Sequence, residues 1–352
     1  MSTPKIFCLP DLEALSESCM SPMARAYLCG GAGDEITMRA NCEDWKLLRL
    51  NPRILVDVSE IDTRTELLGQ SLDLPILLAP AAFQRLWHQE GELATVEGAN
   101  RAGVTLVTST YATVGAADLA RAATRPLWFQ LYTQPDRGMT QELVKLAEAA
   151  GCKAIAVTVD TPVLGIRNRE ARSEFNPGTD VKLPNIAAFL SSGAPVKGFS
   201  LTNPKLTWSD IEWLCSVAKI PVWLKGVMNP DDAVRAATTG AAGVIVSNHG
   251  ARNLDTQPST AAALPRIAEK IQGKIPLLVD GGIRRGSDIV KALALGAKAV
   301  LIGRPYLHGL AIAGAEGVAR VVEVLREELK AVMALTGRRS IAEIDRSVLW
   351  EG

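Results

Sequence analysis

The sequence predicts an α/β fold, a TIM (β/α)8 barrel, because short apolar runs alternate with helix-like stretches eight times. Several of these stretches end in glycine just before the next run, as ANRAG does before VTLVTST and ALGA before KAVLIGR. The main alternative is an open doubly wound sheet, which usually carries GxGxxG after its first strand. This chain has APAAF there, which favours the barrel.

The eight runs are expected to be parallel strands buried on both faces, because they are almost entirely apolar rather than alternating. In chain order they are PILLAP from Pro75, VTLVTS from Val104, LWFQLY from Leu127, AIAVTV from Ala154, VWLKGV from Val222, GVIVSN from Gly243, PLLVDG from Pro276 and AVLIGR from Ala299. Asn229 before Pro230 predicts a helix start after the fifth run, and Ser287-Asp288 predicts another after the seventh.

Two segments depart from this alternation. Residues 1–60 form a predicted N-terminal helical extension, expected to cover one end of a barrel that spans residues 61–340. The stretch from Arg167 to Thr207 is a long loop after the fourth strand, and such loops more often bind ligands or act as lids than serve as linkers. No domain boundary is evident, so residues 1–352 are expected to be one domain.

Composition excludes several function classes. The 38 basic and 38 acidic residues balance, which predicts no nucleic-acid partner and no attraction to acidic membranes. No segment is apolar enough to span a membrane, and the N-terminus lacks a signal-peptide pattern. The six cysteines form no CxxC pair and His and Cys do not cluster, so we expect reduced thiols, a cytoplasmic location and no metal site.

The segment SNHGAR follows the sixth run, where barrel active sites lie. His249 can serve as a base near neutral pH, and Arg252 can bind a carboxylate through two parallel hydrogen bonds. This pattern indicates proton abstraction beside a carboxylate, against the alternative of a capped strand with an incidental polar loop. Asp160, at the end of the fourth run, is expected to raise the pKa of His249, and Tyr132 to hold a substrate oxygen.

The loops after the seventh and eighth runs predict a phosphate site, since these loops often bind phosphate in barrels. Each supplies glycine amides and an arginine, against the alternative of ordinary turns; the residues are Gly281, Gly282 and Arg284, then Gly303 and Arg304. Polar groups remain around the predicted barrel mouth and suit a flat heterocycle; they are Ser109, Gln130, Thr158 and Lys225. Lys225 can stabilise a reduced ring, or alternatively can pair with Asp160 or Asp280. By composition alone Tyr27 is a packing residue, and His88 and His308 are structural or surface histidines.

The chain resembles the FMN-dependent 2-hydroxy acid oxidase and dehydrogenase family, which includes glycolate oxidase, lactate oxidase and mandelate dehydrogenase. The resemblance runs from about Tyr27 to Ser347. It rests on YLCGGAGDE, NPRILVDVS, LLAPAAFQ, QLYTQPDR, TVDTPVLGIRNRE, LKGV, SNHGAR followed by LD, DGGIRRG and IGRP.

The resemblance implies a role for each matching position. His249 matches the catalytic base, Asp160 its carboxylate partner and Tyr132 the tyrosine at the substrate hydroxyl. Tyr27, Arg167 and Arg252 match substrate-binding residues, and Tyr111 borders the side-chain pocket. The positions that match FMN contacts are Pro80, Ala81, Ala82, Ser109, Gln130, Thr158, Lys225, Ser247, Asp280, Gly281, Gly282, Arg284, Gly303 and Arg304.

The reaction implied is oxidation of an (S)-2-hydroxy acid to the 2-oxo acid, with O2 as acceptor to give hydrogen peroxide. Hydride and carbanion routes both stay open. The alternatives are a dehydrogenase of the same family with another acceptor, an FMN barrel isomerase, a flavin-binding scaffold without turnover, and a metal-dependent barrel hydrolase. Intact His249, Arg252, Tyr132 and Lys225 speak against the scaffold. Relatives are often tetramers, so we expect a homo-oligomer.

Three positions depart from glycolate oxidase. Tyr111 replaces a tryptophan, Trp87 a smaller residue and Phe83 a methionine. Because these positions line or border the side-chain pocket, we expect a substrate larger than glycolate, with an aliphatic or aromatic side chain.

Overall fold

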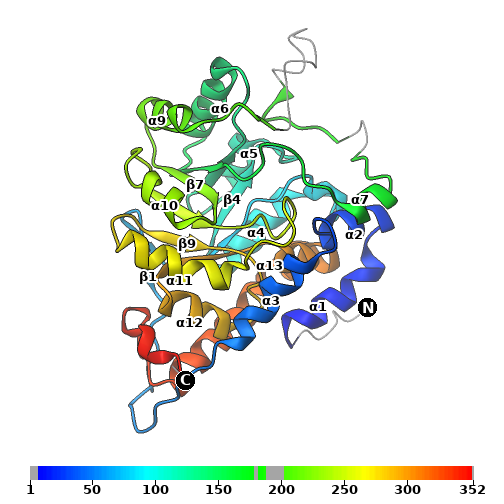
Figure 1. Cartoon of the computed structure of the whole chain (residues 1–352). Helices are drawn as coiled ribbons and strands as arrows, with labels where there is room; N and C mark the ends of the chain where they lie inside the picture. The colour runs from blue at the N-terminus through cyan, green and yellow to red at the C-terminus, as the bar shows by residue number, and fades with distance from the viewer. Residues whose placement is uncertain (1–6, 178–180, 188–201, 351–352) are drawn as a thin grey trace.

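The computed structural model describes residues 7–177, 181–187 and 202–350. Eight parallel strands close into a barrel in the order β10-β3-β4-β5-β6-β7-β8-β9 (Figure 1). They are β3 (Ile76–Leu78), β4 (Thr105–Ser109), β5 (Trp128–Leu131), β6 (Ile155–Thr158), β7 (Val222–Val227), β8 (Gly243–Val246), β9 (Leu277–Val279) and β10 (Ala297–Ile302). Each strand overlaps one of the eight predicted runs, so the TIM barrel is confirmed.

Helices surround the barrel (Figure 1). Their bounds are α1 (Leu9–Ser16), α2 (Pro22–Cys29), α3 (Ile36–Leu47), α4 (Glu92–Ala102), α5 (Ala116–Ala122), α6 (Arg137–Ala149), α7 (Asn168–Arg172), α9 (Trp208–Val217), α10 (Pro230–Ala236), α11 (Thr260–Ile271), α12 (Gly286–Ala294) and α13 (Arg304–Leu335). Short 3-10 turns are η1 (Glu17–Cys19), η2 (Gln84–Leu86), η3 (Ile341–Glu343) and η4 (Arg346–Val348). No helix of these described ranges is long and apolar enough to cross a membrane.

Two of the predicted helix starts have different outcomes. Asn229 caps α10 as predicted, because its Oδ1 accepts the Asp231 N–H at 2.8 Å. The prediction for Ser287-Asp288 is wrong in its boundary, since α12 begins at Gly286. Asp288 instead accepts the backbone N–H groups of Arg284 and Arg285 from inside the first turn, at 2.9 and 3.0 Å. An acidic side chain there still satisfies amides that the helix leaves unpaired.

The barrel strands separate two apolar cores. Ile155 and Val157 of β6 face the surrounding helices, whereas Ala154 and Ala156 face the barrel interior. Large side chains fill the remaining interior, where the rings of Trp128 and Trp223 lie 5.3 Å apart. A Cβ at Gly243 would lie 2.3 Å from the Trp223 ring, so this β8 position requires glycine. The barrel is therefore a packed core, and ligands must bind at its ends.

The expectation that residues 1–60 cover one end of the barrel is met in part. Helix α1 packs against α13, and α3 packs against α11 and α12, so much of the extension runs along the flank of the barrel (Figure 1). Tyr27 and Leu28 line the cavity at the C-terminal ends of the strands, and Ala32 N–H donates to the Ala251 carbonyl there. The N-terminal end is closed by an antiparallel hairpin that the sequence did not reveal, β1 (Thr65–Leu67) and β2 (Gln70–Leu72). Leu67 and Leu72 are buried in the interior core. The hairpin leads directly into β3, which explains its position.

The loop predicted after the fourth strand is present between β6 and β7. Its first part carries α7, which packs against α2 near the barrel mouth. Residues 178–180 and 188–201 of this loop lie outside the described residues. The described part supplies several side chains to a cavity at the barrel mouth.

Candidate active site

A cavity of about 640 Å³ opens at the C-terminal ends of the barrel strands. All the residues predicted for the site line this cavity except Asp160 and Ser247. Asp160 instead contacts the His249 side chain, and Ser247 contacts the Lys225 side chain. The predicted residues that line it are Tyr27, Pro80, Ala81, Ala82, Ser109, Tyr111, Gln130, Tyr132, Thr158, Arg167, Lys225, His249, Arg252, Asp280, Gly281, Gly282, Arg284, Gly303 and Arg304. The structure thus brings together positions from almost the whole chain.

The loop after β8 holds His249 in an unusual backbone conformation. His249, Gly250 and Ala251 all have left-handed φ, at 57°, 60° and 61°. Residues with a Cβ disfavour this region, so the turn is strained and needs support. Ala251 N–H donates to the carbonyl of Asn248 at 2.9 Å, and Ala32 N–H donates to the carbonyl of Ala251 at 2.8 Å. The N-terminal extension therefore helps to fix the histidine loop.

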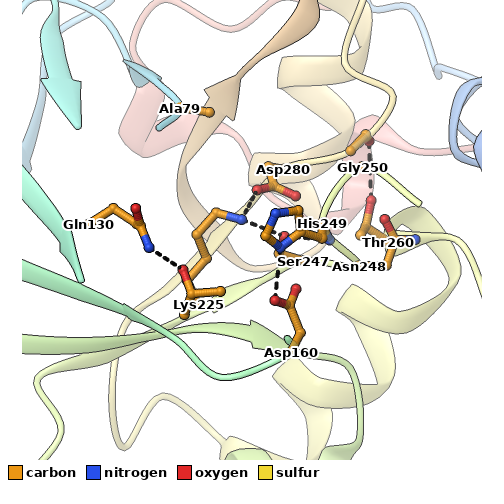
Figure 2. A network of polar contacts seen from close by, with 12 residues as sticks. Ala79, Gln130, Asp160, Lys225, Ser247, Asn248, His249, Gly250, Thr260 and Asp280 are labelled. Atoms are coloured by element: carbon orange, nitrogen blue, oxygen red, sulfur yellow. Dashed lines mark hydrogen bonds and ion pairs between the residues drawn. The ribbon is translucent and has the colours of Figure 1, made fainter. Parts of the chain in front are cut away.

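His249 forms a pair with Asp160 across the ends of β8 and β6 (Figure 2). Its Nδ1 lies 2.9 Å from Asp160 Oδ1, and its Nε2 lies 3.5 Å from the Tyr132 hydroxyl. Burial lowers the pKa of His249 below its ordinary value, while Asp160 acts in the opposite direction. Asp160 therefore acts on the pKa of His249 in the expected direction, but burial outweighs it and the net shift is downward. A neutral imidazole at pH 7, with Nε2 beside the Tyr132 hydroxyl at the cavity, suits a general base.

Two residues that the sequence did not single out hold Asp160 in place. The Thr161 hydroxyl donates to Asp160 Oδ1 at 3.0 Å, and Asn253 Nδ2 donates to the Asp160 carbonyl at 2.8 Å. Imidazole contact keeps the pKa of Asp160 below its ordinary value although burial acts to raise it. Gly226 of β7 is required beside it, because a Cβ there would lie 2.5 Å from the Asp160 side chain. Thr161 and Asn253 adjoin predicted motifs, but their contacts with Asp160 depend on packing between loops.

Arg252 and Arg167 lie together at the outer end of the cavity. Arg252 Nη1 donates to the carbonyls of Tyr27 and Gly30 at 2.6 and 3.0 Å, and its guanidinium lies 4.7 Å from the Tyr27 ring centre. Arg167 Nε donates to the Arg252 carbonyl at 2.9 Å. Burial lowers the pKa of Arg167, and the positive charge of the neighbouring Arg252 lowers it further. Two guanidinium groups so close together form a binding site for a carboxylate.

Glu170 also lies in this arginine site, and it was not predicted from the sequence. It pairs with Arg252 at 2.7 Å and with Arg167 at 3.3 Å. Its spacing could have indicated the pair with Arg167, because Glu170 follows Arg167 by three residues at the start of a short helix.

Aromatic side chains form the wall between the arginines and β3–β5. The rings of Tyr27 and Phe175 stack with centres 4.3 Å apart, and those of Tyr111 and Tyr132 stack at 5.1 Å. Phe83 joins the two pairs, 5.9 Å from Tyr27 and 6.5 Å from Tyr111. Phe175 was not predicted, because the loop that carries it has no regular pattern. The cavity therefore offers an apolar surface beside its anion site.

The inner end of the cavity is lined by polar side chains from successive strands (Figure 2). Gln130 Nε2 donates to the Thr158 hydroxyl at 2.9 Å, and the Ser109 hydroxyl donates to Gln130 Oε1 at 3.2 Å. Ser109 of β4 and Gln130 of β5 are paired in register, and Thr158 of β6 lies two residues beyond Ala156, the β6 partner of Gln130. The barrel strands therefore set the spacing of this row. It presents donors and acceptors along one edge, as a flat heterocycle requires.

Lys225 of β7 is buried at the centre of this inner end (Figure 2). Its Nζ lies 3.0 Å from Asp280 Oδ2 and donates to the Ser247 hydroxyl at 3.0 Å. Burial acts to lower the pKa of Lys225, but Asp280 and Asp160 together hold it above its ordinary value. The alternative of a Lys–Asp280 pair is thus correct, and it does not remove Lys225 from the cavity. Asp280 Oδ1 is buried and has no hydrogen-bond partner among the described residues, so a polar group of a ligand can still bind it.

The far end of the cavity has the chemistry of a phosphate site. Arg304 starts α13, is partly buried, and donates to the backbone carbonyls of Leu28, Gly250 and Gly30 at 2.9 to 3.0 Å. No carboxylate among the described residues pairs with it, and desolvation lowers its pKa to about 10. A partly buried cation at a helix N-terminus, without an anionic partner among these residues, is a site for an anion.

Two glycines that line the same cavity as Arg304 leave the backbone open to a ligand. Gly281 and Gly282 have φ of 93° and 78°, and a Cβ at Gly282 would lie 1.8 Å from the Asn41 carbonyl oxygen. Arg284 also lines this end, where its Nε pairs with Glu13 at 2.8 Å. These residues fit the phosphate of FMN, while Lys225 and the Gln130 row fit its ring. The described residues contain no cluster of His, Cys, Asp or Glu that could hold a metal ion.

Comparison with known proteins agrees with this geometry. A family model described as FMN-dependent dehydrogenase matches residues 16–351. The chain is 47% identical to an L-lactate oxidase of Nostoc sp., covering 96% of each chain. It is 42% identical to a 2-hydroxyacid oxidase of Dictyostelium discoideum, covering 97% of this chain and 89% of that one.

Solved structures give the same result. The crystal structure of mandelate oxidase with (S)-2-phenylpropionate superposes with a TM-score of 0.90 at 37% identity, over 98% of both chains. The cavity, the buried Lys225 and the His249–Asp160 pair lie in the part of the chain that these matches cover. With nearly its whole length matched by one family model and by close relatives, this chain belongs to the FMN-dependent dehydrogenase family and uses FMN as its cofactor.

Proposed function

We propose that the protein is an (S)-2-hydroxy-acid oxidase, which converts its substrate to the 2-oxo acid with O2 as electron acceptor. The observation that carries this proposal is the position of His249, whose Nε2 faces the cavity between the arginine site and the Lys225 end. Relatives at 47% and 42% identity are an L-lactate oxidase and a 2-hydroxyacid oxidase, which supports the same reaction.

In this proposal the outer end of the cavity binds and deprotonates the substrate. Arg252 and Arg167 bind its carboxylate, and the Tyr132 hydroxyl, 3.5 Å from His249 Nε2, positions the oxygen on C2. His249 accepts a substrate proton at Nε2. Asp160 stabilises the imidazolium that results, because its carboxylate contacts Nδ1 at 2.9 Å.

The inner end holds the cofactor, which when bound accepts two electrons from the substrate and passes them to O2. Lys225 supplies a positive charge at the ring, and Asp280 and Ser247 fix its ammonium group. Arg304 and Arg284 bind the phosphate. The remaining contacts proposed for the cofactor come from Pro80, Ala81, Ala82, Ser109, Gln130, Thr158, Gly281, Gly282 and Gly303.

The aromatic wall sets the size of the substrate in this proposal. Phe83, Trp87 and Tyr111 line the cavity beside the arginines, so an apolar side chain on C2 is desolvated there. We therefore propose a substrate with an aliphatic or aromatic side chain. Turnover of glycolate equal to or better than that of 2-hydroxyoctanoate and mandelate would contradict this.

The test of the proposed function begins with the absorbance spectrum of the purified protein. Anaerobic addition of (S)-2-hydroxy acids should bleach the flavin bands, and admitting O2 should restore them with release of hydrogen peroxide. Bleaching without fast recovery in O2 would favour the dehydrogenase alternative. Flavin bands that no 2-hydroxy acid bleaches would exclude the reaction itself.

We also propose a single-domain, cytoplasmic homo-oligomer, with a tetramer as the state to test. None of the six cysteines forms a disulfide, which suits a reducing compartment. Ile54, Leu55 and Trp350 are exposed at 82%, 98% and 62%, and such apolar exposure suits contact with another subunit. Sedimentation of the FMN-loaded protein tests the oligomer, and fractionation of the source cells tests the location.

A further inference from the structure

One acidic side chain of the chain already lies between the two arginines of the anion site. Glu170 Oε1 accepts from Arg252 Nη2 at 2.7 Å, and both Glu170 oxygens accept from Arg167 Nη1, at 3.4 and 3.3 Å. The three side chains are only 13 to 14% exposed. All three line the cavity, so this group of charges faces the ligand space.

The backbone fixes where Glu170 can reach. It lies on α7, whose first backbone hydrogen bond runs from Ala171 N–H to the Arg167 carbonyl at 3.0 Å. Arg252 is fixed independently, through the carbonyls of Tyr27 and Gly30 on the other side of the site. The carboxylate is therefore held by two loops that are far apart in the sequence. It cannot leave the arginines without a rotation of its own side chain.

The sum of the charges determines what the site can accept. Arg252 and Arg167 carry two positive charges, and Glu170 cancels one of them. The nearby His249–Asp160 pair adds no cation while the imidazole is neutral, and the ionised Asp160 then carries one negative charge. The arginine site itself keeps one positive charge for a ligand, and the charge on Asp160 disfavours a second anionic group further.

We propose that Glu170 is a specificity-determining residue that restricts the site to substrates with a single carboxylate. A 2-hydroxydicarboxylate would bring a second negative charge next to Glu170, with no free cation among the described cavity residues at that end to receive it and an aromatic wall beside it. This inference rests on the proposed function for the substrate class, but the charge arrangement exists without it. Glu170 selects by repulsion of the wrong ligand, which is a general route to specificity.

The test uses Glu170→Gln, which keeps the shape of the side chain and removes its charge. Glu174→Gln is the matched control, because Glu174 lines the same cavity from the same segment, is exposed, and forms no ion pair with the described residues. Two probes of equal carbon number are compared on the FMN-loaded enzyme, (S)-2-hydroxypentanoate and (S)-2-hydroxyglutarate. The quantity measured is the ratio of their second-order rates of anaerobic flavin bleaching.

We expect the dicarboxylate-to-monocarboxylate ratio to rise about tenfold or more in Glu170→Gln, since a like charge is removed from a buried site, and to stay unchanged in Glu174→Gln. An unchanged ratio in Glu170→Gln would overturn the proposal. So would an equal rise in the control, because it would show a general charge effect of the segment.

A second measurement does not depend on turnover. Glutarate and pentanoate are titrated against the flavin absorbance of the same proteins, and the ratio of their Kd values should shift toward glutarate in Glu170→Gln alone. If no 2-hydroxy acid bleaches the wild-type flavin, the proposed function fails, while these Kd values still decide the role of Glu170. Equal Kd ratios in wild type and Glu170→Gln would overturn it in either case.

Discussion

The two ends of the cavity are built in different ways. At the inner end, Lys225 lies in β7, and Ser247 and Asp280 directly follow the neighbouring strands β8 and β9, so the hydrogen-bonded sheet fixes their distances. At the outer end, Tyr27, Arg167 and Arg252 come from α2, from the start of α7 and from the loop after β8. Those segments touch only because the chain packs them together. The comparison indicates that the barrel determines cofactor binding, whereas loops determine which substrate is accepted.

The largest expected effect comes from His249→Gln at the outer end. Loss of a general base should lower the rate of anaerobic flavin reduction about a thousandfold, since general acid–base catalysis contributes roughly 10²–10⁴. The variant should still bind FMN, because the groups that fit the ring and phosphate are untouched. Stopped-flow bleaching and the FMN content measure the two effects. A parallel loss of FMN would contradict the division between the two ends.

The next effect is that of Asp160→Asn, which keeps His249 but removes its carboxylate partner. We expect reduction to slow about a hundredfold, because the imidazolium loses its stabilising charge. Asp160 acts to raise the pKa of His249 against burial, so its removal should lower that pKa further. The base is active when deprotonated, and activity is lost as the pH falls through this pKa.

A pH profile of kcat/KM measures this shift. In the wild type the acidic limb should lie below pH 6.5, the ordinary value for histidine, because burial lowers the pKa. In Asp160→Asn the limb should move to still lower pH. A wild-type limb well above 6.5 would show that Asp160 outweighs burial in setting the pKa of His249. A limb that moves to higher pH in the variant would contradict the raising effect of Asp160 itself.

Lys225→Met tests the inner end. It leaves Asp280 buried without its cation, a change that costs about 3–5 kcal/mol in buried pairs. We therefore expect a lower Tm and a protein purified with little FMN, in contrast to His249→Gln. The double variant Lys225→Met, Asp280→Asn removes both charges and should recover Tm without recovering FMN. Recovery of both would show that Lys225 acts only through folding.

The smallest expected effect is that of Phe175→Leu on the aromatic wall. Its ring stacks on Tyr27 at 4.3 Å, and aromatic pairs contribute about 0.5–1.5 kcal/mol. KM for 2-hydroxyoctanoate or mandelate should rise a few fold, with kcat and FMN content unchanged. The same change with glycolate should be negligible, because glycolate has no side chain to contact the wall. Equal changes for all substrates would assign Phe175 to loop packing instead.

The fold and the cofactor end were largely predictable from the sequence. Strands buried on both faces must be apolar throughout, so eight runs were visible, and parallel strands place their C-terminal residues at one end. The positions of Lys225, Asp280 and Gly281 therefore followed from their place at the C-terminal end of a run. The hairpin of β1 and β2 was missed, because two strands of three residues carry too little pattern.

By itself, the sequence determined the class of barrel, the strand-end residues and the family, since these depend on local pattern and motif spacing. Only the tertiary structure decided that burial holds the pKa of His249 down, that Lys225 pairs with Asp280, and that Glu170 lies between two arginines. The physical reason is that pKa and ion pairing depend on distance and burial. Those quantities exist only after loops remote in the chain have packed around one cavity.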